Sequence, residues 1–426
     1  MKQGSLRQYF DGIACKSLTS VDTVQGKSNQ HEVGGRNAFN TLLGTDANRM
    51  RKENNGIPTR YVRITDDAED SLTVDSDVTW YDSRWKDPKR GPEWRLYYPT
   101  NEVTRVMREG DLFLLAKKPD GTLLIVVAPN GSTVEQQLQW LFGVEATHSI
   151  ETLFGDDLET GPLDHQVRGI LEDLGIEVLP EDSGWLDRMV ETFHGAFPST
   201  ARFSDFARAT LPEMDAKADP DGALLAWFER EDVLFRELEQ HVVSQRIREG
   251  FQSGNRTDVA SFVRFSLSVN NRRKSRAGYA FAHHVREVFL RCGIAFEAEV
   301  VTEMKKRLDF MLPSGSLYHR EDVARERLIA LGVKTTCKDR WRQVLSEAEH
   351  IPQKYLLTLE TRISFSQLQE MASDGLRLVI PKARHWDFGG MAPGTEPMSV
   401  AEFIEMARER QTEFGILPGQ MAFEVF

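Results

Sequence analysis

The stretch ALGVKTTCKDRWRQVLSEAEH, residues 330–350, decides the fold because it passes from a buried strand into an amphipathic helix. Its apolar start predicts a strand that holds Lys334, and the polar residues that follow predict a helix that begins near Asp339. Arg340 and Glu347 are separated by about two helical turns, so they share one face of that helix. The opposite, apolar face consists of Trp341, Val344, Leu345 and Ala348.

Strands and helices alternate through the rest of the region after Gly293. The expected strands are residues 294–301, 307–313, 329–336, 354–359 and 376–381, and the expected helices are 339–350 and 364–373. This alternation is typical of an α/β core with a mixed sheet.

Residues 180–266 predict helices, including a long amphipathic stretch from Ala223 to Arg248. Another helix is expected to follow NRRKSRAG, residues 271–278. Its buried stripe would consist of Phe281, Val285, Val288 and Phe289.

The N-terminal part of the chain predicts β-structure. Residues 111–129 form an expected hairpin whose turn carries Pro119, Asp120 and Gly121, and Ser132 or Thr133 would cap the helix that follows. We expect a β-rich pseudobarrel domain over residues 1–165, a linker over 166–185 and an α/β domain with an added helical region over 186–426.

The bulk composition indicates a globular protein of two domains. The chain of 426 residues is too long for one ordinary core, and its composition, 40% hydrophobic and 28% charged, is that of a globular protein.

No apolar run reaches the roughly 18 residues of a membrane helix, so no membrane contact is expected. The segment MKQGSLRQYF lacks the apolar core of a signal peptide. Three cysteines without a CxxC pair favour a cytoplasmic location and exclude a structural zinc site of the usual spacing.

The net charge of −12 argues against a uniformly basic, DNA-covering surface. Its distribution is uneven, however. Acidic residues gather between 145 and 240, and basic residues gather at 270–276, 305–307 and 338–342. Local basic clusters can bind a polyanion on an acidic protein, so charge alone leaves nucleic-acid binding open.

Asp309 interrupts an apolar strand, RLDFMLP, where a charged side chain needs a reason. Hydrolysis of a phosphodiester uses divalent cations held by carboxylates, with a lysine beside them to orient or activate water. Asp309 and Lys334 on neighbouring strands fit that need. In the usual nuclease pattern an acid precedes the lysine by two residues, but Gly332 stands there, so Glu347 is the natural second acid. A purely structural Asp–Lys pair and a solvated Glu347 remain the alternatives.

SVNNRRKSRAG (268–278) together with VKTTCKDRWRQVLSEAEH (333–350) resembles the catalytic domain of EcoRII-type restriction endonucleases. The resemblance covers residues 180–385 well and extends more weakly to QHEVG (30–34) and WYDSR (80–84). It implies a PD-(D/E)xK nuclease domain whose second acid has moved to the helix. It also implies that Asp309 and Glu347 bind Mg²⁺ and that Lys334 acts on the attacking water.

The resemblance also implies DNA contacts. The residues that would read G·C pairs in the major groove are Lys338, Asp339 and Arg340. Those that would contact backbone phosphates at the start of their helix are Arg272, Arg273, Lys274 and Arg276. The effector-domain contacts would be His31, Arg36, Lys89, Arg90, Glu93 and Arg95. The alternatives are an exposed helix N-terminus, a solvated basic turn and, for His31, a structural histidine.

One departure from the family pattern concerns the helix after RKSRAG. The family usually has a glutamate there, and Ala282 occupies that place in this chain. Alanine binds no metal. Either Glu287 or a neighbouring histidine substitutes, or the chain is a deliberately inactivated variant. We expect weakened or abolished cleavage, with DNA and metal binding partly retained. Glu287 lies about 500° further around the helix and would face away.

We therefore expect a homodimeric type II restriction endonuclease that cuts double-stranded DNA at a short palindrome with CC and GG halves and is controlled by a second DNA site. A cognate DNA methyltransferase would be its functional, not physical, partner. The alternative is a non-cleaving, sequence-specific DNA-binding protein, which Ala282 favours. An RNA-processing nuclease has no supporting motif.

Overall fold

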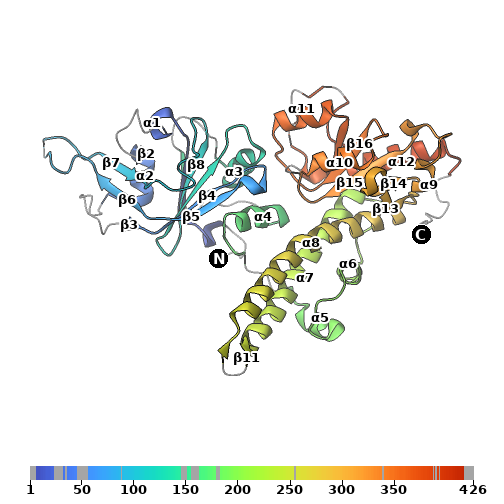
Figure 1. Ribbon diagram of the computed structural model, residues 1–426, viewed down its shortest axis with the longest axis horizontal. Coiled ribbons are helices and arrows are strands. Elements are labelled where there is room, and N and C mark those ends of the chain that lie inside the picture. The colour runs from blue at the N-terminus through green and yellow to red at the C-terminus, as the bar shows by residue number, and fades with distance from the viewer. Residues whose placement is uncertain are drawn as a thin grey trace. The chain divides into compact units, whose positions relative to one another are not determined.

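The computed structural model describes residues 6–23, 32–33, 36–45, 56–87, 89–144, 151–154, 163–178, 183–253, 256–337, 340–386, 388, 391–392 and 394–416. Contacts divide the chain into two compact units (Figure 1). Unit 1 comprises Met1–Val178 with Arg362–Ser366, and unit 2 comprises Leu179–Thr361 with Gln367–Phe426. Both contain helices and sheets, so the fold is mixed α/β. Within the described ranges, no helix is long and apolar enough to cross a membrane.

A six-stranded sheet forms the centre of unit 1. Its order is β10 (Glu151–Phe154), β1 (Gly12–Ser17), β8 (Leu112–Lys117), β9 (Leu123–Ala128), β4 (Thr59–Arg63) and β5 (Leu72–Asp75). The expected hairpin is confirmed as β8 and β9, with Gly121 at φ +83° in the turn. These two strands are apolar on both faces because helices cover one face and a second sheet covers the other.

The helices on the first face are α3 (Thr133–Phe142) and α4 (His165–Asp173). The Ser132 side chain caps α3 by accepting the Glu135 N–H, as predicted. Residues 166–178, which the sequence predicted as linker, instead belong to unit 1. Their apolar residues, among them Val167, Ile170 and Leu171, recur at helical spacing and pack into its core, which the acidic composition of the segment concealed.

A four-stranded sheet covers the second face. Its order is β2 (Glu32–Val33), β7 (Trp94–Tyr97), β6 (Val78–Asp82) and β3 (Gly56–Ile57), and α2 (Arg36–Leu43) packs beside it. Trp80 and Trp94 stack with ring centroids 5.5 Å apart in this second core. The short elements of the unit are η1 (Leu6–Gln8), α1 (Ser20–Thr23) and η2 (Ala68–Asp70).

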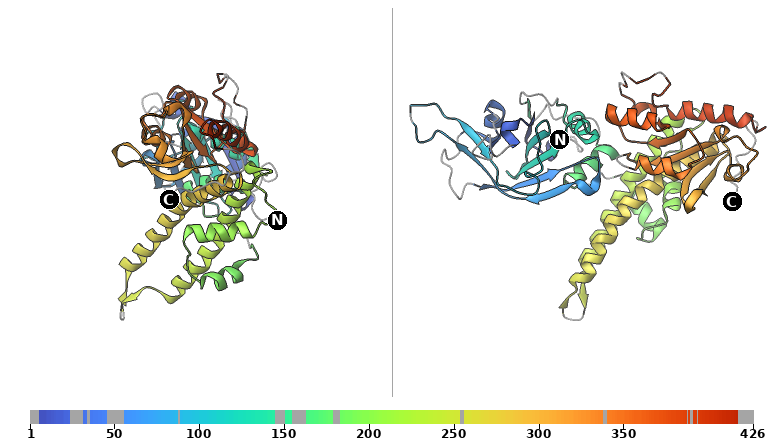
Figure 2. Two further views of the ribbon diagram at one scale, coloured as in Figure 1. Left: turned by 90° about the vertical axis from the view of Figure 1, so that its right-hand side faces the viewer. Right: turned by 45° about the horizontal axis from the view of Figure 1, so that its top comes forward.

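Unit 2 begins with helices. They are α5 (Leu186–Phe193), α6 (Thr200–Ala209), α7 (Pro220–Glu249) and α8 (Val259–Arg291). The hairpin of β11 (Gln252–Ser253) and β12 (Arg256–Thr257) joins α7 to α8, which lie side by side (Figure 2).

The predicted start of α8 was wrong. The helix begins at Val259, where Asp258 accepts the Ser261 N–H, and not after NRRKSRAG. No glycine or proline occurs between Val259 and Ala277 to interrupt it. The basic run 272–276 therefore lies in the middle of a helix.

The sheet of unit 2 has the order β13 (Glu297–Val301), β14 (Arg307–Leu312), β15 (Ile329–Lys334), β16 (Lys354–Thr358) and β17 (Leu376–Val379). β13, β14 and β15 pair antiparallel, whereas β15, β16 and β17 pair parallel. The predicted mixed sheet is thus confirmed. The remaining elements are α9 (Gly315–Tyr318), α10 (Trp341–Glu347), α11 (Phe365–Ser373), α12 (Val400–Thr412), η4 (Glu303–Lys305), η5 (Arg325–Arg327) and η6 (Lys382–Arg384).

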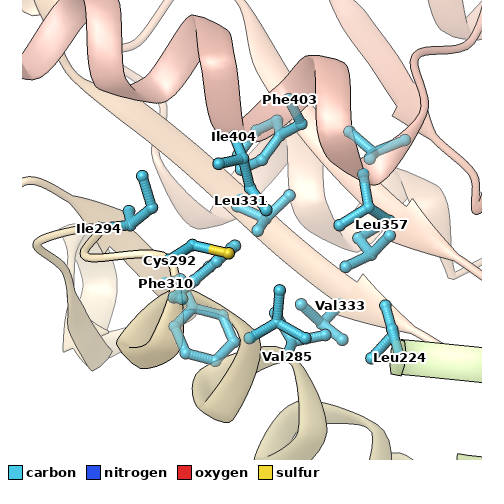
Figure 3. Close-up of a cluster of buried hydrophobic side chains, with 14 of the residues drawn as sticks. Leu224, Val285, Cys292, Ile294, Phe310, Leu331, Val333, Leu357, Phe403 and Ile404 are labelled. Carbon is cyan, nitrogen blue, oxygen red and sulfur yellow. The ribbon is translucent and has the colours of Figure 1, made fainter. Parts of the chain in front are cut away.

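Helices α8 and α12 cover one face of this sheet. The predicted apolar stripe of α8 packs against this face. Val285 of α8 lies near Leu331 and Val333 of β15, and Phe403 of α12 belongs to the same cluster (Figure 3). Helix α10 lies against the other face, where Val344 is buried against Gly332. The residues of β15 that alternate with Leu331 and Val333, Lys334 included, consequently lie on the α10 side.

Candidate active site

Asp309 and Lys334 meet where β14 and β15 separate. The paired register of the two strands ends at Phe310 opposite Leu331. Beyond it, Asp309 Oδ2 accepts the main-chain N–H of Val333 at 2.7 Å and the Nζ of Lys334 at 2.8 Å. The acid that breaks the apolar pattern therefore replaces a main-chain hydrogen-bonding partner and holds the lysine at an opening in the sheet.

Glu347 is the last residue of α10 and lies in the same electrostatic environment. Burial raises the pKa of Glu347; the Lys334 ammonium opposes this shift and the Asp309 carboxylate adds to it. Its Oε2 is buried and accepts no hydrogen bond from the part of the chain that the structure describes. A buried oxygen without a partner is costly, and a bound cation would satisfy it. Asp309 and Glu347 thus fit a divalent metal ion.

Gly332 stands where the usual nuclease pattern has an acid, and the packing of α10 explains why no larger residue fits there. A Cβ at this position would lie 2.6 Å from Val344 Cγ2 of α10. The helix approaches β15 so closely that the usual strand acid has no room. The same approach carries Glu347 toward Lys334.

Ala282 supplies no ligand, and its neighbours do not replace one. It is partly buried and packs against the apolar cluster under β15. Glu287 Oε1 accepts from Arg291 Nε at 2.8 Å. His284 is fully buried between Arg208, at 3.0 Å, and Glu231, at 2.9 Å, and burial lowers its pKa. Among the described residues, no group of three or more His, Cys, Asp or Glu side chains is placed to hold a metal.

Comparisons with known proteins identify the family of this chain. A family model described as EcoRII C terminal matches residues 235–404. The type II restriction enzyme EcoRII of Escherichia coli is 30% identical over 405 residues, which is 93% of each chain. This chain belongs to the EcoRII family.

Two solved structures match this chain at lower sequence identity than the E. coli enzyme does. Metal-depleted Ecl18kI in complex with uncleaved, modified DNA is 14% identical, with a TM-score of 0.43, over 58% of this chain and 88% of the other. The restriction endonuclease PspGI in its substrate DNA complex is 15% identical, with a TM-score of 0.42, over 51% and 94%.

Of the expected base-reading residues in this EcoRII-family chain, Lys338 and Asp339 lie outside the described residues. Arg340 is exposed and directly precedes α10, with its N–H donating to the Cys337 carbonyl at 2.7 Å. Arg340 and Glu347 therefore stand at opposite ends of α10, which is shorter than the helix expected over residues 339–350. Trp341 and Val344 are buried between them.

The basic run on α8 divides into exposed and buried members. Arg272 is exposed and lies over the Phe197 ring, and Arg273 donates to Glu239 at 2.5 Å. The side chain of Lys274 lies outside the description. Arg276 is only 5% exposed, so its side chain is too deeply buried for the predicted contact with a DNA phosphate. Its guanidinium faces Glu231 at 3.4 Å and lies over the rings of Phe203 and Phe235, a buried arrangement that periodicity alone did not reveal.

The expected effector contacts fall in and near the four-stranded sheet of unit 1. His31 and the side chain of Arg36 lie outside the described part of the chain. Lys89 and Arg90 are exposed. Glu93 pairs with Arg95 and with Arg84, each at 2.6 Å, so these charges partly neutralise one another.

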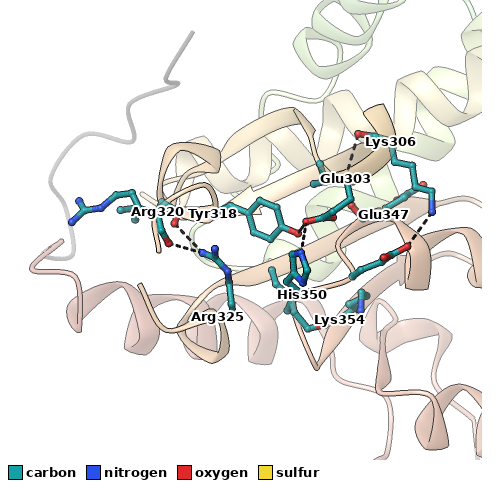
Figure 4. Close-up of polar contacts among 12 residues, drawn as sticks. Glu303, Lys306, Tyr318, Arg320, Arg325, Glu347, His350 and Lys354 are labelled. Carbon is teal, nitrogen blue, oxygen red and sulfur yellow. Dashed lines mark hydrogen bonds and ion pairs between the residues drawn. The ribbon is translucent and has the colours of Figure 1, made fainter. Parts of the chain in front are cut away.

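Sequence reasoning missed Thr302, whose hydroxyl donates to the main-chain carbonyl of Glu347. It also missed the group around Glu303, which joins Tyr318 and His350 (Figure 4). The sequence marks this segment only by the basic cluster at 305–307, and no local signal indicates the contact of Thr302 with Glu347, 45 residues further along the chain.

Proposed function

We propose that this EcoRII-family chain is a Mg²⁺-dependent type II restriction endonuclease that hydrolyses DNA at a short palindrome with CC and GG halves. The observation that carries the proposal is the pair Asp309–Lys334 beside a buried, unpaired oxygen of Glu347. The 30% sequence identity to a type II restriction enzyme over 93% of the chain supports it.

Asp309 and Glu347 would hold the ion. When bound, Mg²⁺ neutralises charge at the phosphate and favours formation of the hydroxide nucleophile. The Val333 N–H fixes one oxygen of Asp309, and that oxygen in turn holds the Lys334 ammonium. Lys334 thereby presents its charge at a fixed point, where it orients the attacking water and stabilises the developing negative charge.

Arg340, together with Lys338 and Asp339, would read G·C pairs, since arginine and lysine donate to guanine and aspartate accepts from cytosine. Unit 1 would be a pseudobarrel effector domain that binds a second DNA copy through the exposed Lys89 and Arg90. A two-fold site calls for a homodimer. We place the enzyme in the cytoplasm, with a methyltransferase that protects the same sites.

A second function is favoured by one observation. Ala282 offers a methyl group where the family usually has a glutamate, and its described neighbours Glu287 and His284 are engaged elsewhere. A non-cleaving, sequence-specific DNA-binding protein would tolerate this change. An enzyme would be slowed by it, because a carboxylate that binds metal or a metal-bound water is lost.

The test is plasmid cleavage with Mg²⁺ by the wild-type chain and by Ala282→Glu. We expect discrete fragments from both chains, formed more slowly by the wild type. Ala282→Glu combined with Asp309→Ala serves as the control and should be inactive. Fragments from the Glu variant alone would favour the DNA-binding function for the natural chain, and no fragments from either would refute the endonuclease.

A further inference from the structure

The turn between β13 and β14 contacts the end of α10. The Thr302 hydroxyl donates to the main-chain carbonyl of Glu347, and its N–H donates to the Lys306 carbonyl at 2.9 Å. Thr302 is 7% exposed, so water does not readily replace this hydroxyl. One buried side chain therefore joins a strand connection to the residue that carries the second acid.

This hydrogen bond is made at the C-terminal end of α10, where main-chain carbonyls have no donor within the helix. The residue after Glu347, Ala348, has already left helical conformation, with φ −149° and ψ 71°. The Thr302 hydroxyl supplies the missing donor at Glu347 itself. It thereby restrains the main chain from which the carboxylate extends toward Asp309 and Lys334.

The turn is itself held in a fixed shape. Met304 and Lys305 have φ values of +54° and +61°, a left-handed conformation that side chains rarely adopt. Such conformations persist only where surrounding contacts enforce them, and they gather at functional sites. Here the contacts come from Glu303, which accepts from the Tyr318 hydroxyl and lies 3.4 Å from His350 Nε2 (Figure 4).

We propose that Thr302 is a positioning residue that fixes Glu347 for divalent-metal binding. It touches neither DNA nor metal and acts only through the main chain of Glu347. The proposal rests on the proposed function, because it takes Asp309 and Glu347 as the metal ligands.

The test compares Thr302→Val, which keeps the shape but removes the hydroxyl, with Thr302→Ser, which keeps the hydroxyl. Mn²⁺ affinity of the full chain is measured by electron paramagnetic resonance of the free ion, without DNA or turnover. We expect the Val variant to bind Mn²⁺ about tenfold more weakly, as is typical when a group that orients a metal ligand is removed. The Ser variant should bind like the wild type. Equal affinities for the wild type and the Val variant would overturn the proposal, as would a Ser variant as weak as Val.

Thermal unfolding of each variant separates loss of positioning from loss of folding. If Thr302→Val does not fold, Tyr318→Phe decides the matter, because it removes the hydrogen bond that anchors Glu303 and so loosens the turn that places the Thr302 hydroxyl. A weaker Mn²⁺ affinity of a variant that still folds is expected there. Unchanged affinity would overturn the proposal.

Asp309→Ala and Glu347→Gln distinguish failure of the inference from failure of the proposed function. If both weaken Mn²⁺ binding and Thr302→Val does not, only the role of Thr302 is refuted. If neither does, or if the wild type binds no Mn²⁺, the metal site is refuted and the role of Thr302 with it.

Discussion

Asp309 takes the place of a main-chain acceptor in the sheet. Its carboxylate receives the Val333 N–H, so β14 and β15 separate without leaving that N–H unpaired. The same oxygen receives Lys334. The Asp309 carboxylate thus pairs a main-chain N–H and the Lys334 ammonium, which is why a charged side chain is tolerated within an apolar strand.

Glu347→Gln should stabilise the metal-free protein near neutral pH while abolishing cleavage. The pKa of Glu347 is raised in the fold, so its contribution to stability is complete below the ordinary glutamate pKa of about 4.3 and is lost as pH rises through the folded value. Glutamine mimics the protonated acid and escapes this loss. Thermal unfolding in a chelator from pH 4 to 8 should show the variant's advantage growing with pH.

The outcome that contradicts this prediction is an advantage that is constant with pH or reversed. Asp374→Asn is a suitable control, because Asp374 is an exposed carboxylate remote in sequence from the site. It controls for the general effect of removing one negative surface charge.

Arg340→Ala should lose discrimination between cognate and altered sites by about 1–3 kcal/mol per contacted base pair. The exposed position of Arg340 beside α10 leaves its guanidinium accessible to a base edge. Binding is measured on cognate and random duplexes with Ca²⁺ in place of Mg²⁺. Equal weakening on both duplexes would instead assign Arg340 to a phosphate.

At the level of elements, α8 combines two roles along one helix. Its second half carries the apolar stripe that covers the sheet, and its middle carries the basic run. Because helical residues four apart share a face, Arg272 and Arg276 lie on the same side of α8, one turn apart. Their depth differs: Arg272 lies over the Phe197 ring and stays exposed, whereas Arg276 is buried against Glu231 of α7.

Arg276→Ala should therefore destabilise the protein far more than Arg272→Ala. Removal of Arg276 leaves buried Glu231 beside His284, which burial keeps from becoming charged by lowering its pKa. The loss of the one cationic partner at Glu231 among the described residues should therefore cost about 3–5 kcal/mol. Loss of an exposed charge such as Arg272 typically costs below about 1 kcal/mol. Urea unfolding measures both variants. Similar unfolding free energies for the two would contradict the structural assignment of Arg276.

At the level of the whole molecule, the acidic net charge and DNA binding are compatible because of where charges are placed. Arg272 and Arg340 of unit 2, and Lys89 and Arg90 of unit 1, are exposed, whereas Arg276 and Lys16 are buried in ion pairs. A count of charges along the sequence does not distinguish exposed basic residues from buried ones. Only the burial of each side chain in the fold does so.

Much of the fold could be predicted from the sequence, since hydrophobic periodicity is a local property. It predicted the strands that became β13 to β17, the hairpin of β8 and β9, and the helix that carries Glu347. Hydrophobic periodicity gave wrong predictions where the apolar pattern was weak or could be interpreted in two ways. The acidic stretch near residue 170 concealed a packed helix, and the basic run was taken for a turn before a helix.

The sequence by itself determined the residues of the candidate site. Asp309 and Lys334 interrupt apolar strands, and Gly332 pointed to an acid on the next helix. Only the tertiary structure decided how these residues are held. The close approach of Val344 to Gly332, the replacement of a strand partner by Asp309 and the contact of Thr302 with Glu347 each join segments distant along the chain. Such contacts depend on packing, which no local pattern of residues encodes.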